Sequence, residues 1–191
     1  MPSDTKNALL DSAERAARSK GFDGFSYADL ARDVGIRKAS IHHHFPTKAD
    51  LSIALMQRYY DSFRNVCAEI DARETTGAAR LDALIEQYRL AIDGGKTLCL
   101  CVSFSTSRAS LPEDVIAQIS RFRTMMISWI ETAFEQGRSD GTIAGVRNPA
   151  HEAAATLPLL EGAQLSARAE ENPQLFNNAI QLLTSRLPAP V

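Results

Sequence analysis

The chain has 191 residues, of which 45% are hydrophobic and 23% are charged, a composition that is ordinary for a soluble globular protein with a sizeable core. Its formal net charge of −2 does not point to a polyanionic partner, and no run of about 18 apolar residues predicts a membrane span. The N-terminus lacks the apolar centre of a signal peptide. Three cysteines without an export signal therefore predict reduced thiols in the cytoplasm.

Residues typical of helix starts and helix ends recur along the chain, and patterns typical of strands are nearly absent. This predicts an all-α fold of about nine helices. Two of the expected helices begin with a hydroxyl residue that is followed three positions later by an acidic one, a pattern typical of a helix cap. These pairs are Ser26 with Asp29 and Thr47 with Asp50. Four helices are expected early in the chain, over about residues 4–20, 26–35, 37–44 and 47–70.

Five more helices are expected over about residues 78–93, 97–110, 112–136, 149–169 and 173–187. Gly137 is expected to end the third of these, and Pro158 to kink the fourth. Asn148 and Asn172 each precede a proline, which is typical of a cap followed by the first helical residue.

The second and third helices have the spacing of a helix-turn-helix. A small residue, Ala31, lies four positions before the turn glycine Gly35, and apolar Ile41 lies six positions after it. The small residue lets two helices cross closely, the glycine relieves strain in the turn, and the apolar residue anchors the second helix inward. We therefore expect a three-helix domain over residues 1–47 and a larger helical domain over residues 48–191.

A local cationic surface follows from the segment "GIRKASIHHHFPTKADL", residues 35–51. No acid occurs between Asp33 and Asp50, and such a surface can bind phosphate although the whole chain is acidic. The outward side of the third helix is predicted to carry cations, a hydroxyl and imidazoles: Arg37, Lys38, Ser40, His42, His43 and His44.

The three adjacent histidines have alternative interpretations. Consecutive helical residues diverge by about 100°, so the imidazoles cannot converge on one metal ion, and no metal site is expected. A tag remnant is disfavoured because the run is internal and lies between apolar Ile41 and Phe45. Imidazole nitrogens can instead pair with base edges or phosphates. One or two of the rings, His44 first, alternatively pack or face solvent without a role.

The segment "FSYADLARDVGIRKASIHHHFPTKADL" resembles the DNA-binding domain of TetR-type bacterial transcriptional regulators, over about residues 5–55. The resemblance implies that the third helix enters the major groove and that the starts of the second and fourth helices clamp phosphates. Lys48 is the phosphate contact implied for the fourth helix. The DNA-binding residues it implies are Ser26, Tyr27, Arg37, Lys38, Ser40, His42, His43, His44 and Lys48. Family members often have Tyr in place of His42 and Ser in place of Arg37, which leaves the operator sequence open.

The larger domain is expected to form a dimer and to hold an effector cavity, as the resemblance implies. Small residues in the eighth helix and an apolar face on the last helix would pack as a four-helix bundle across a twofold axis. The expected interface residues are Ala155, Leu159, Gly162, Ala163, Phe176, Ile180 and Leu183. An internal helical hairpin is the alternative.

The segment "KTLCLCVSFSTSRASLPEDV" resembles a subgroup of these regulators with a cysteine-rich sixth helix. Cys99 and Cys101 would lie about 200° apart on a helix and could not bond to each other. Sensing of oxidants or electrophiles and plain packing both stay open for them. The expected effector pocket, whose members would equally serve as core, is Tyr88, Cys99, Cys101, Phe104, Phe122, Met125, Met126 and Trp129.

Together these features predict a ligand-responsive homodimeric repressor that binds double-stranded operator DNA and is released by a small molecule. Repression is what the resemblance implies, and activation is an alternative. An enzyme is disfavoured because the chain lacks a Cys-x-x-Cys pair, a nucleotide-binding glycine loop and a paired catalytic constellation. No cofactor is expected. A module whose helix-turn-helix serves protein contacts only is the second rival.

Overall fold

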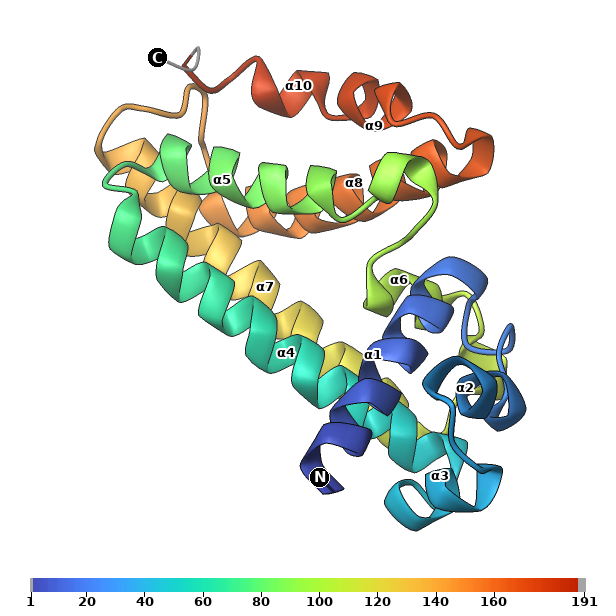
Figure 1. The fold of residues 1–191 in the computed structure, drawn as a ribbon. Helices are drawn as coiled ribbons and strands as arrows, with labels where there is room; N and C mark the ends of the chain where they lie inside the picture. Colours follow the sequence, from blue (N-terminus) through green and yellow to red (C-terminus); the bar gives the residue numbers. More distant parts are fainter. Residues whose placement is uncertain (1, 189–191) are drawn as a thin grey trace. The chain divides into compact units, whose positions relative to one another are not determined.

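The computed structural model describes residues 2–188, and all regular structure within that range is helical (Figure 1). The all-α prediction is therefore confirmed. The α-helices are α1 (Pro2–Lys20), α2 (Tyr27–Val34), α3 (Lys38–His44), α4 (Lys48–Arg73), α5 (Gly77–Leu90), α6 (Leu100–Ser105), α7 (Glu113–Ser139), α8 (Pro149–Glu170), α9 (Gln174–Ala179) and α10 (Gln181–Thr184). Short 3₁₀ helices cover Asp93–Gly95 and Arg108–Ser110. Within residues 2–188, none of the helices combines the length and the apolar character that a membrane span requires.

Contacts divide the chain into two compact units. Unit 1 comprises the chain up to Asp61 together with Leu100–Phe122, and unit 2 comprises Ser62–Cys99 and the chain from Arg123 onward. The helices α4 and α7 each contribute one part to unit 1 and another to unit 2. The division expected at residues 47 and 48 remains a prediction about which part binds DNA.

Unit 1 is built around α1, which packs against both α2 and α6. The apolar side of α1 buries Leu9, Ala13 and Ala17. Ser103 of α6 donates a hydrogen bond to the Ala17 carbonyl, and Phe104 meets Phe22 edge-on with ring centroids 5.5 Å apart. These contacts hold α6 against the helix that supports α2.

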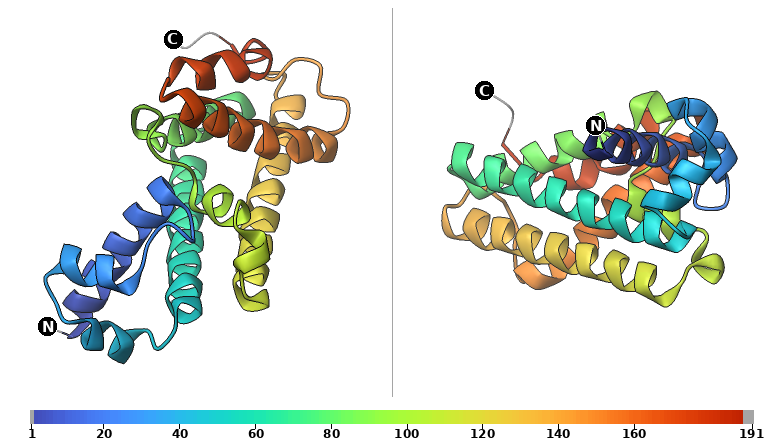
Figure 2. Two further views of the ribbon diagram at one scale, coloured as in Figure 1. Left: turned by 90° about the vertical axis from the view of Figure 1, so that its right-hand side faces the viewer. Right: turned by 60° about the horizontal axis from the view of Figure 1, so that its bottom comes forward.

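In unit 2, α8 packs against both α5 and α9 (Figures 1 and 2). Its central polar residue is Gln164, which is completely buried. Gln164 Oε1 accepts the Cys99 N–H at 2.8 Å, and its Nε2 donates to the Tyr88 carbonyl at 3.1 Å. One side chain of α8 therefore satisfies backbone groups at both ends of the α5–α6 connection.

Three helix predictions need correction. Residues 97–110 form only α6 and a 3₁₀ turn. Backbone and hydroxyl groups of this segment bond to other elements and to nearby carbonyls instead of extending the helix; the Cys99 N–H, for example, donates to Gln164. The helix expected over 173–187 is broken between α9 and α10 at Ile180. Pro158 lies inside α8 as expected, and the kink there stays a prediction; the third correction concerns the end of α7.

Gly137 does not end α7, which continues to Ser139. A Cβ at Gly137 would come within 2.3 Å of the Ile143 side chain, so this glycine allows close packing inside the helix. The chain turns afterwards at Gly141, whose φ of 75° suits glycine.

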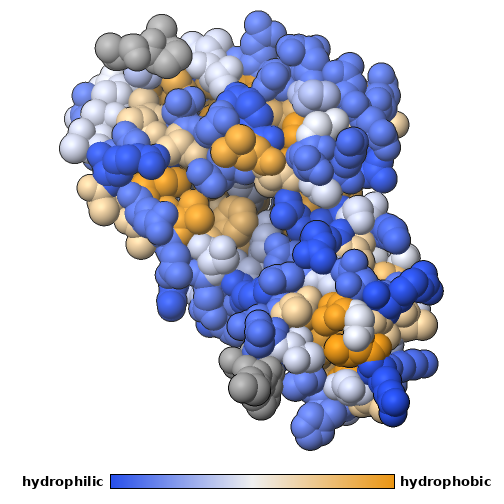
Figure 3. Space-filling model, in the orientation of Figure 1, coloured by the Kyte–Doolittle hydropathy of each residue, from blue (hydrophilic) through white to orange (hydrophobic). Residues whose placement is uncertain are grey.

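The face drawn in Figure 3 is mainly hydrophilic and is interrupted by apolar patches. Among the residues described, three large apolar side chains are exposed: Leu90, Leu165 and Leu182.

Candidate nucleic-acid interface

The turn between α2 and α3 forms as its sequence predicts. Ser26 and Asp29 make a reciprocal capping box at the start of α2. Gly35 ends the helix in the left-handed region with φ of 73°, and its N–H donates to the Ala31 carbonyl. Ile41 is fully buried. These local interactions fix the path along which α3 leaves the turn.

The outward side of α3 is an exposed polar surface. Arg37, Lys38, Ser40, His42 and His43 are exposed, whereas His44 is half-buried. A groove of about 580 Å³ lies along this side, and it is lined by Thr5 of α1 together with Ile36, Arg37, Ala39, Ser40, His43 and His44. The chain from Val34 to Ala49 contains no carboxylate. We call the exposed side chains Arg37, Lys38, Ser40, His42 and His43 the α3 face.

The three histidines have different surroundings. His42 Nδ1 lies 3.1 Å from the Pro46 carbonyl oxygen, and its ring lies 5.0 Å from that of Tyr27. The rings of His43 and His44 meet edge-on at 5.5 Å. Among the residues described, no group of three His, Cys, Asp or Glu side chains is placed to hold a metal ion. The arrangement suits hydrogen bonding to a partner outside the chain.

The side chain of Tyr27 is bonded within unit 1, and the DNA contact expected of this residue stays a prediction. It is only 7% exposed, and its hydroxyl donates toward the carbonyls of Phe45 at 2.9 Å and Thr47 at 2.5 Å. Burial, followed by the nearby Asp50 carboxylate, raises the pKa of Tyr27 to about 12. The side chain therefore braces the end of α3 from α2. The prediction stays for the backbone at the start of α2.

Lys48 is likewise bonded within unit 1, and the phosphate contact expected of it stays a prediction. Its Nζ donates to the carbonyls of Phe22 and Phe25, the latter at 2.7 Å, and lies 4.6 Å and 4.3 Å from the centroids of the two rings. Burial lowers the pKa of Lys48. The ammonium is thus bound to the α1–α2 loop within unit 1, where it ties that loop to the start of α4.

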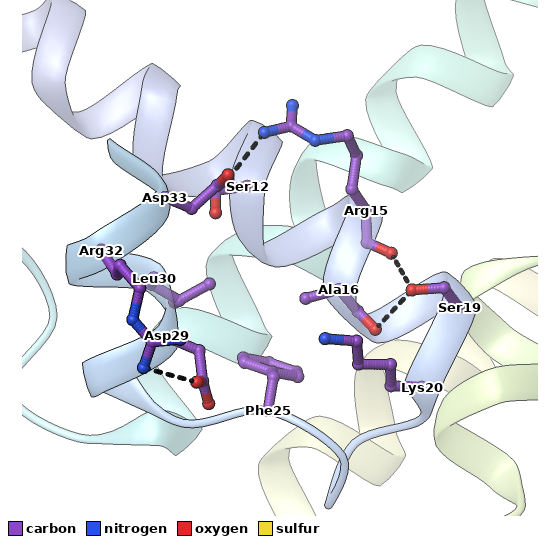
Figure 4. A pocket seen from close by; sticks show the side chains of 10 residues that line it. All are labelled: Ser12, Arg15, Ala16, Ser19, Lys20, Phe25, Asp29, Leu30, Arg32 and Asp33. Carbon is purple, nitrogen blue, oxygen red and sulfur yellow. Dashed lines mark hydrogen bonds and ion pairs between the residues drawn. The ribbon is translucent and has the colours of Figure 1, made fainter. Parts of the chain in front are cut away.

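A second groove in unit 1, between α1 and α2, is lined by charges of both signs (Figure 4). Arg15 of α1 forms a 2.9 Å ion pair with Asp33 of α2, and Arg32 lies 3.4 Å from Asp29. The hydroxyl of Ser12 and the Arg15 guanidinium hold the pKa of the Asp33 carboxyl below its usual range. Two of the groove's three cations, Arg15 and Arg32, are therefore paired with carboxylates, whereas the segment that carries the α3 face contains no carboxylate.

Sequence reasoning missed two features of the site. Thr5 of α1 lines the α3 groove, and the Lys6 Nζ lies 5.7 Å from the ring centroid of Phe45. Nothing in their local sequence distinguishes these residues from other polar positions on α1.

The expected effector residues do not gather in one unit. Cys101, Phe104 and Phe122 are buried in unit 1, whereas Tyr88, Cys99, Met125, Met126 and Trp129 belong to unit 2. Neither groove described above contains any of the eight. The Trp129 indole donates to Asp71 at 3.0 Å. A common pocket for all eight residues therefore remains a prediction.

The cysteines are buried and free. Cys99 precedes α6, so the expectation that it shares a helix with Cys101 is wrong. Burial, followed by the Asp71 carboxylate, raises the pKa of the Cys67 thiol to about 12, which disfavours the reactive thiolate.

The expected dimer residues divide into two groups. Ala163, Phe176, Ile180 and Leu183 are buried within unit 2, where they hold α8, α9 and α10 together, and their place in an interface stays a prediction. Ala155 is exposed, and Leu159 and Gly162 are half-exposed. Further apolar or small residues share the outward side of α8: Ala154, Pro158 and Leu165.

A helix-turn-helix with a positively charged second helix, followed by a larger helical unit, defines a class of DNA-binding regulators. Residues 9–55 match the family described as bacterial regulatory proteins, tetR family. The chain is 23% identical to the transcriptional repressor NemR of Escherichia coli over 98% of this chain and 96% of the relative. It is 34% identical to the transcriptional regulator CymR of Pseudomonas putida, over 54% of this chain and 48% of that one.

A TetR-family regulator from Agrobacterium tumefaciens has the same fold, with a TM-score of 0.92 and 28% identity over 99% of this chain and 100% of that chain. Residues 9–55 thus match the DNA-binding domain of the tetR family, and the whole chain is similar in sequence and fold to TetR-family transcriptional regulators.

Proposed function

We propose that the chain is a homodimeric repressor whose two α3 helices read the half-sites of a twofold operator in successive major grooves. The observation that carries this proposal is the α3 face: exposed cations and imidazoles on a short helix within a stretch that has no carboxylate. Arg and Lys side chains can donate to guanine edges or to phosphates, and the hydroxyl of Ser40 can pair with either. A repressor of this kind would act in the cytoplasm, where the operator lies.

Fluorescence anisotropy with DNA from upstream of the protein's own gene tests this proposal. Affinity should fall steeply as salt rises, with a slope of about −0.9 per phosphate neutralised. Arg37→Ala and Lys38→Ala should each weaken binding about five- to 100-fold. Arg32→Ala is the matched control, because Arg32 is an exposed cation of the same unit that lies on α2 beside Asp29. Equal losses in all three variants would refute α3 as the reading helix.

Dimerisation is proposed through the outward side of α8 together with Leu182 of α10. That side of α8 exposes Ala154, Ala155 and Leu165, and Leu182 is 84% exposed. A helix with apolar residues on its outer face as well as its inner face is typical of one that packs against a partner.

Sedimentation of Leu165→Glu and Leu182→Glu tests this surface. Both variants should shift the protein toward the monomer, because each would bury a charge at the interface. Leu90→Glu, at an exposed leucine of α5, is the control and should leave the dimer intact. A dimer unchanged in both test variants would overturn the proposed surface.

Release by a small molecule is proposed to act through α4. This helix begins four residues after α3 ends, and it belongs to both units. A ligand that prefers one arrangement of the dimer would change operator affinity by about five- to 150-fold. A thermal-shift screen would find candidate ligands, and anisotropy with each one tests the coupling. A ligand that stabilises the protein and leaves operator affinity unchanged would count against the scheme.

A further inference from the structure

The imidazole of His42 is held in one orientation on an otherwise exposed surface. Its Nδ1 lies 3.1 Å from the Pro46 carbonyl oxygen, and its ring lies against Tyr27 with centroids 5.0 Å apart. The residue as a whole is exposed on α3. Two contacts therefore fix one edge of the ring and leave the other edge for a partner.

The carbonyl contact determines which nitrogen carries the proton. A carbonyl oxygen only accepts hydrogen bonds, so Nδ1 must be the protonated nitrogen in the neutral ring. Nε2 is then an acceptor in neutral His42 and becomes a donor when the ring is protonated. Ring protonation leaves the contact with Pro46 unchanged and inverts the hydrogen-bonding character of the free edge.

Base edges in the major groove distinguish these two states. Adenine N6 and cytosine N4 present donors, which pair with an acceptor. Adenine N7 and thymine O4 each present one acceptor, whereas guanine presents two, N7 and O6, and no donor, so guanine suits a donor best. Histidine is the side chain whose ordinary titration falls between about pH 5 and 8. The same residue can therefore select different base pairs at different pH.

We infer that His42 is a proton-controlled specificity residue: neutral, it favours an adenine or cytosine amino group at one operator position, and protonated, it favours guanine at that position. This inference rests on the proposed function, because it requires α3 to lie in the major groove.

Several charged and titratable groups surround the switch. On α3 these are Lys38, His43 and His44. On α2, Tyr27 stays neutral over the whole range because its pKa is raised to about 12. At the start of α4, Asp50 bonds to the Thr47 N–H and hydroxyl, and the Lys48 ammonium is directed to the Phe22 and Phe25 carbonyls. Lys6 of α1 lies over Phe45. Among these groups, His43 and His44 also carry imidazoles, so a variant of a neighbouring histidine is needed as a control.

Selection from a pool of randomised half-sites, at about pH 8 and about pH 5.5 and at one ionic strength, tests the inference. Sequencing of the bound DNA gives the base preference at every position. We expect one position per half-site to change from adenine or cytosine to guanine, with a change in relative enrichment of at least roughly fivefold.

Two variants of His42 and one of its neighbour sharpen the test. His42→Phe keeps a planar ring against Tyr27 and removes both nitrogens, so the change of preference should disappear. His42→Gln offers a donor and an acceptor that do not titrate, so its preference should be the same at both pH values. His43→Phe is the matched control and should retain the change.

Each outcome decides the matter. The inference is overturned if all positions keep their preferences while total affinity rises in acid, since His42 would then contact phosphate. It is overturned equally if the change survives in His42→Phe. No enrichment at either pH refutes the proposed function and this inference together, whereas enrichment with unchanged preferences refutes this inference alone.

Discussion

Replacing Lys48 with methionine separates two roles that its position allows. The family resemblance implies a phosphate contact at the start of α4, whereas the structure directs the Nζ to the carbonyls of Phe22 and Phe25. A phosphate contact contributes to DNA affinity and to its salt dependence. An internal brace contributes to the free energy of unfolding. Lys48→Met keeps most of the side-chain stem and removes only the charge and the donors.

The stability cost follows from the contacts that would be lost. Hydrogen bonds from a charged donor contribute about 1.5–3 kcal/mol each, and a cation over an aromatic ring about 0.5–1 kcal/mol. Burial, which lowers the pKa of Lys48, subtracts from this gain, and water can replace the donor at a half-exposed site. A net loss of about 2 kcal/mol is expected. For a chain of this size it corresponds to a fall in Tm of about 4–8 °C.

The assay combines thermal unfolding with a salt titration of operator affinity. In Lys48→Met the Tm should fall while the slope of log affinity against log salt stays unchanged. Lys38→Met, at an exposed lysine of the α3 face, should have the opposite effects. The slope of log affinity against log salt should become shallower by about 0.9 per protomer, and Tm should stay nearly unchanged. A Lys48→Met protein with normal Tm and the slope of Lys38→Met would refute the brace.

Three further variants test the packing around the site and in unit 2. Tyr27→Phe should cost about 1–2 kcal/mol of stability because two backbone carbonyls at the end of α3 lose their donor, and equal urea midpoints for variant and parent would contradict this. Gln164→Leu should lower the free energy of unfolding by about 3 kcal/mol because it removes the partner of a buried N–H and of a buried carbonyl. Denaturant unfolding measures this loss, and an unchanged free energy of unfolding would contradict the prediction. Asp140 accepts the N–H groups of Gly77 and Thr142 and the Thr142 hydroxyl, and these bonds outweigh burial and lower its pKa. Its stabilisation is therefore present above the unfolded pKa of about 3.9 and is lost as pH falls through the lower folded value. Asp140→Asn should be slightly less stable than the parent at neutral pH, by an amount that solvent screening keeps small at this exposed site, and the two should converge once the pH is below the folded pKa. A gap that persists in acid would disprove the cause.

The parts of the fold that the sequence predicted depend on contacts between near neighbours. The capping residues Ser26 and Thr47 each act within three positions, and Gly35 acts through the conformation of one residue. The parts that it did not predict depend on distant partners. Lys48 bonds to carbonyls 23 and 26 residues away, and the N–H of Cys99 bonds to a side chain 65 residues away. Periodicity carries no information about such partners, so the inward direction of Lys48 and the early end of the helix around Cys99 could be learned only from the structure.

The same reasoning explains why a family motif does not by itself assign a role to each of its residues. Tyr27 and Lys48 match the motif, and both direct their polar atoms to backbone carbonyls that position α3 and α4. Arg37 and Lys38 lie in the same motif and are both exposed. Within residues 2–188, neither side chain forms a hydrogen bond or an ion pair with the rest of unit 1. Variants of the first pair should therefore change Tm more than the salt slope, and variants of the second pair the salt slope more than Tm. His42 has features of both pairs, since its Nδ1 bonds to the Pro46 carbonyl and its Nε2 is the nitrogen that we infer to meet a base edge. For this reason its titration can alter base preference without loosening the helix that carries it.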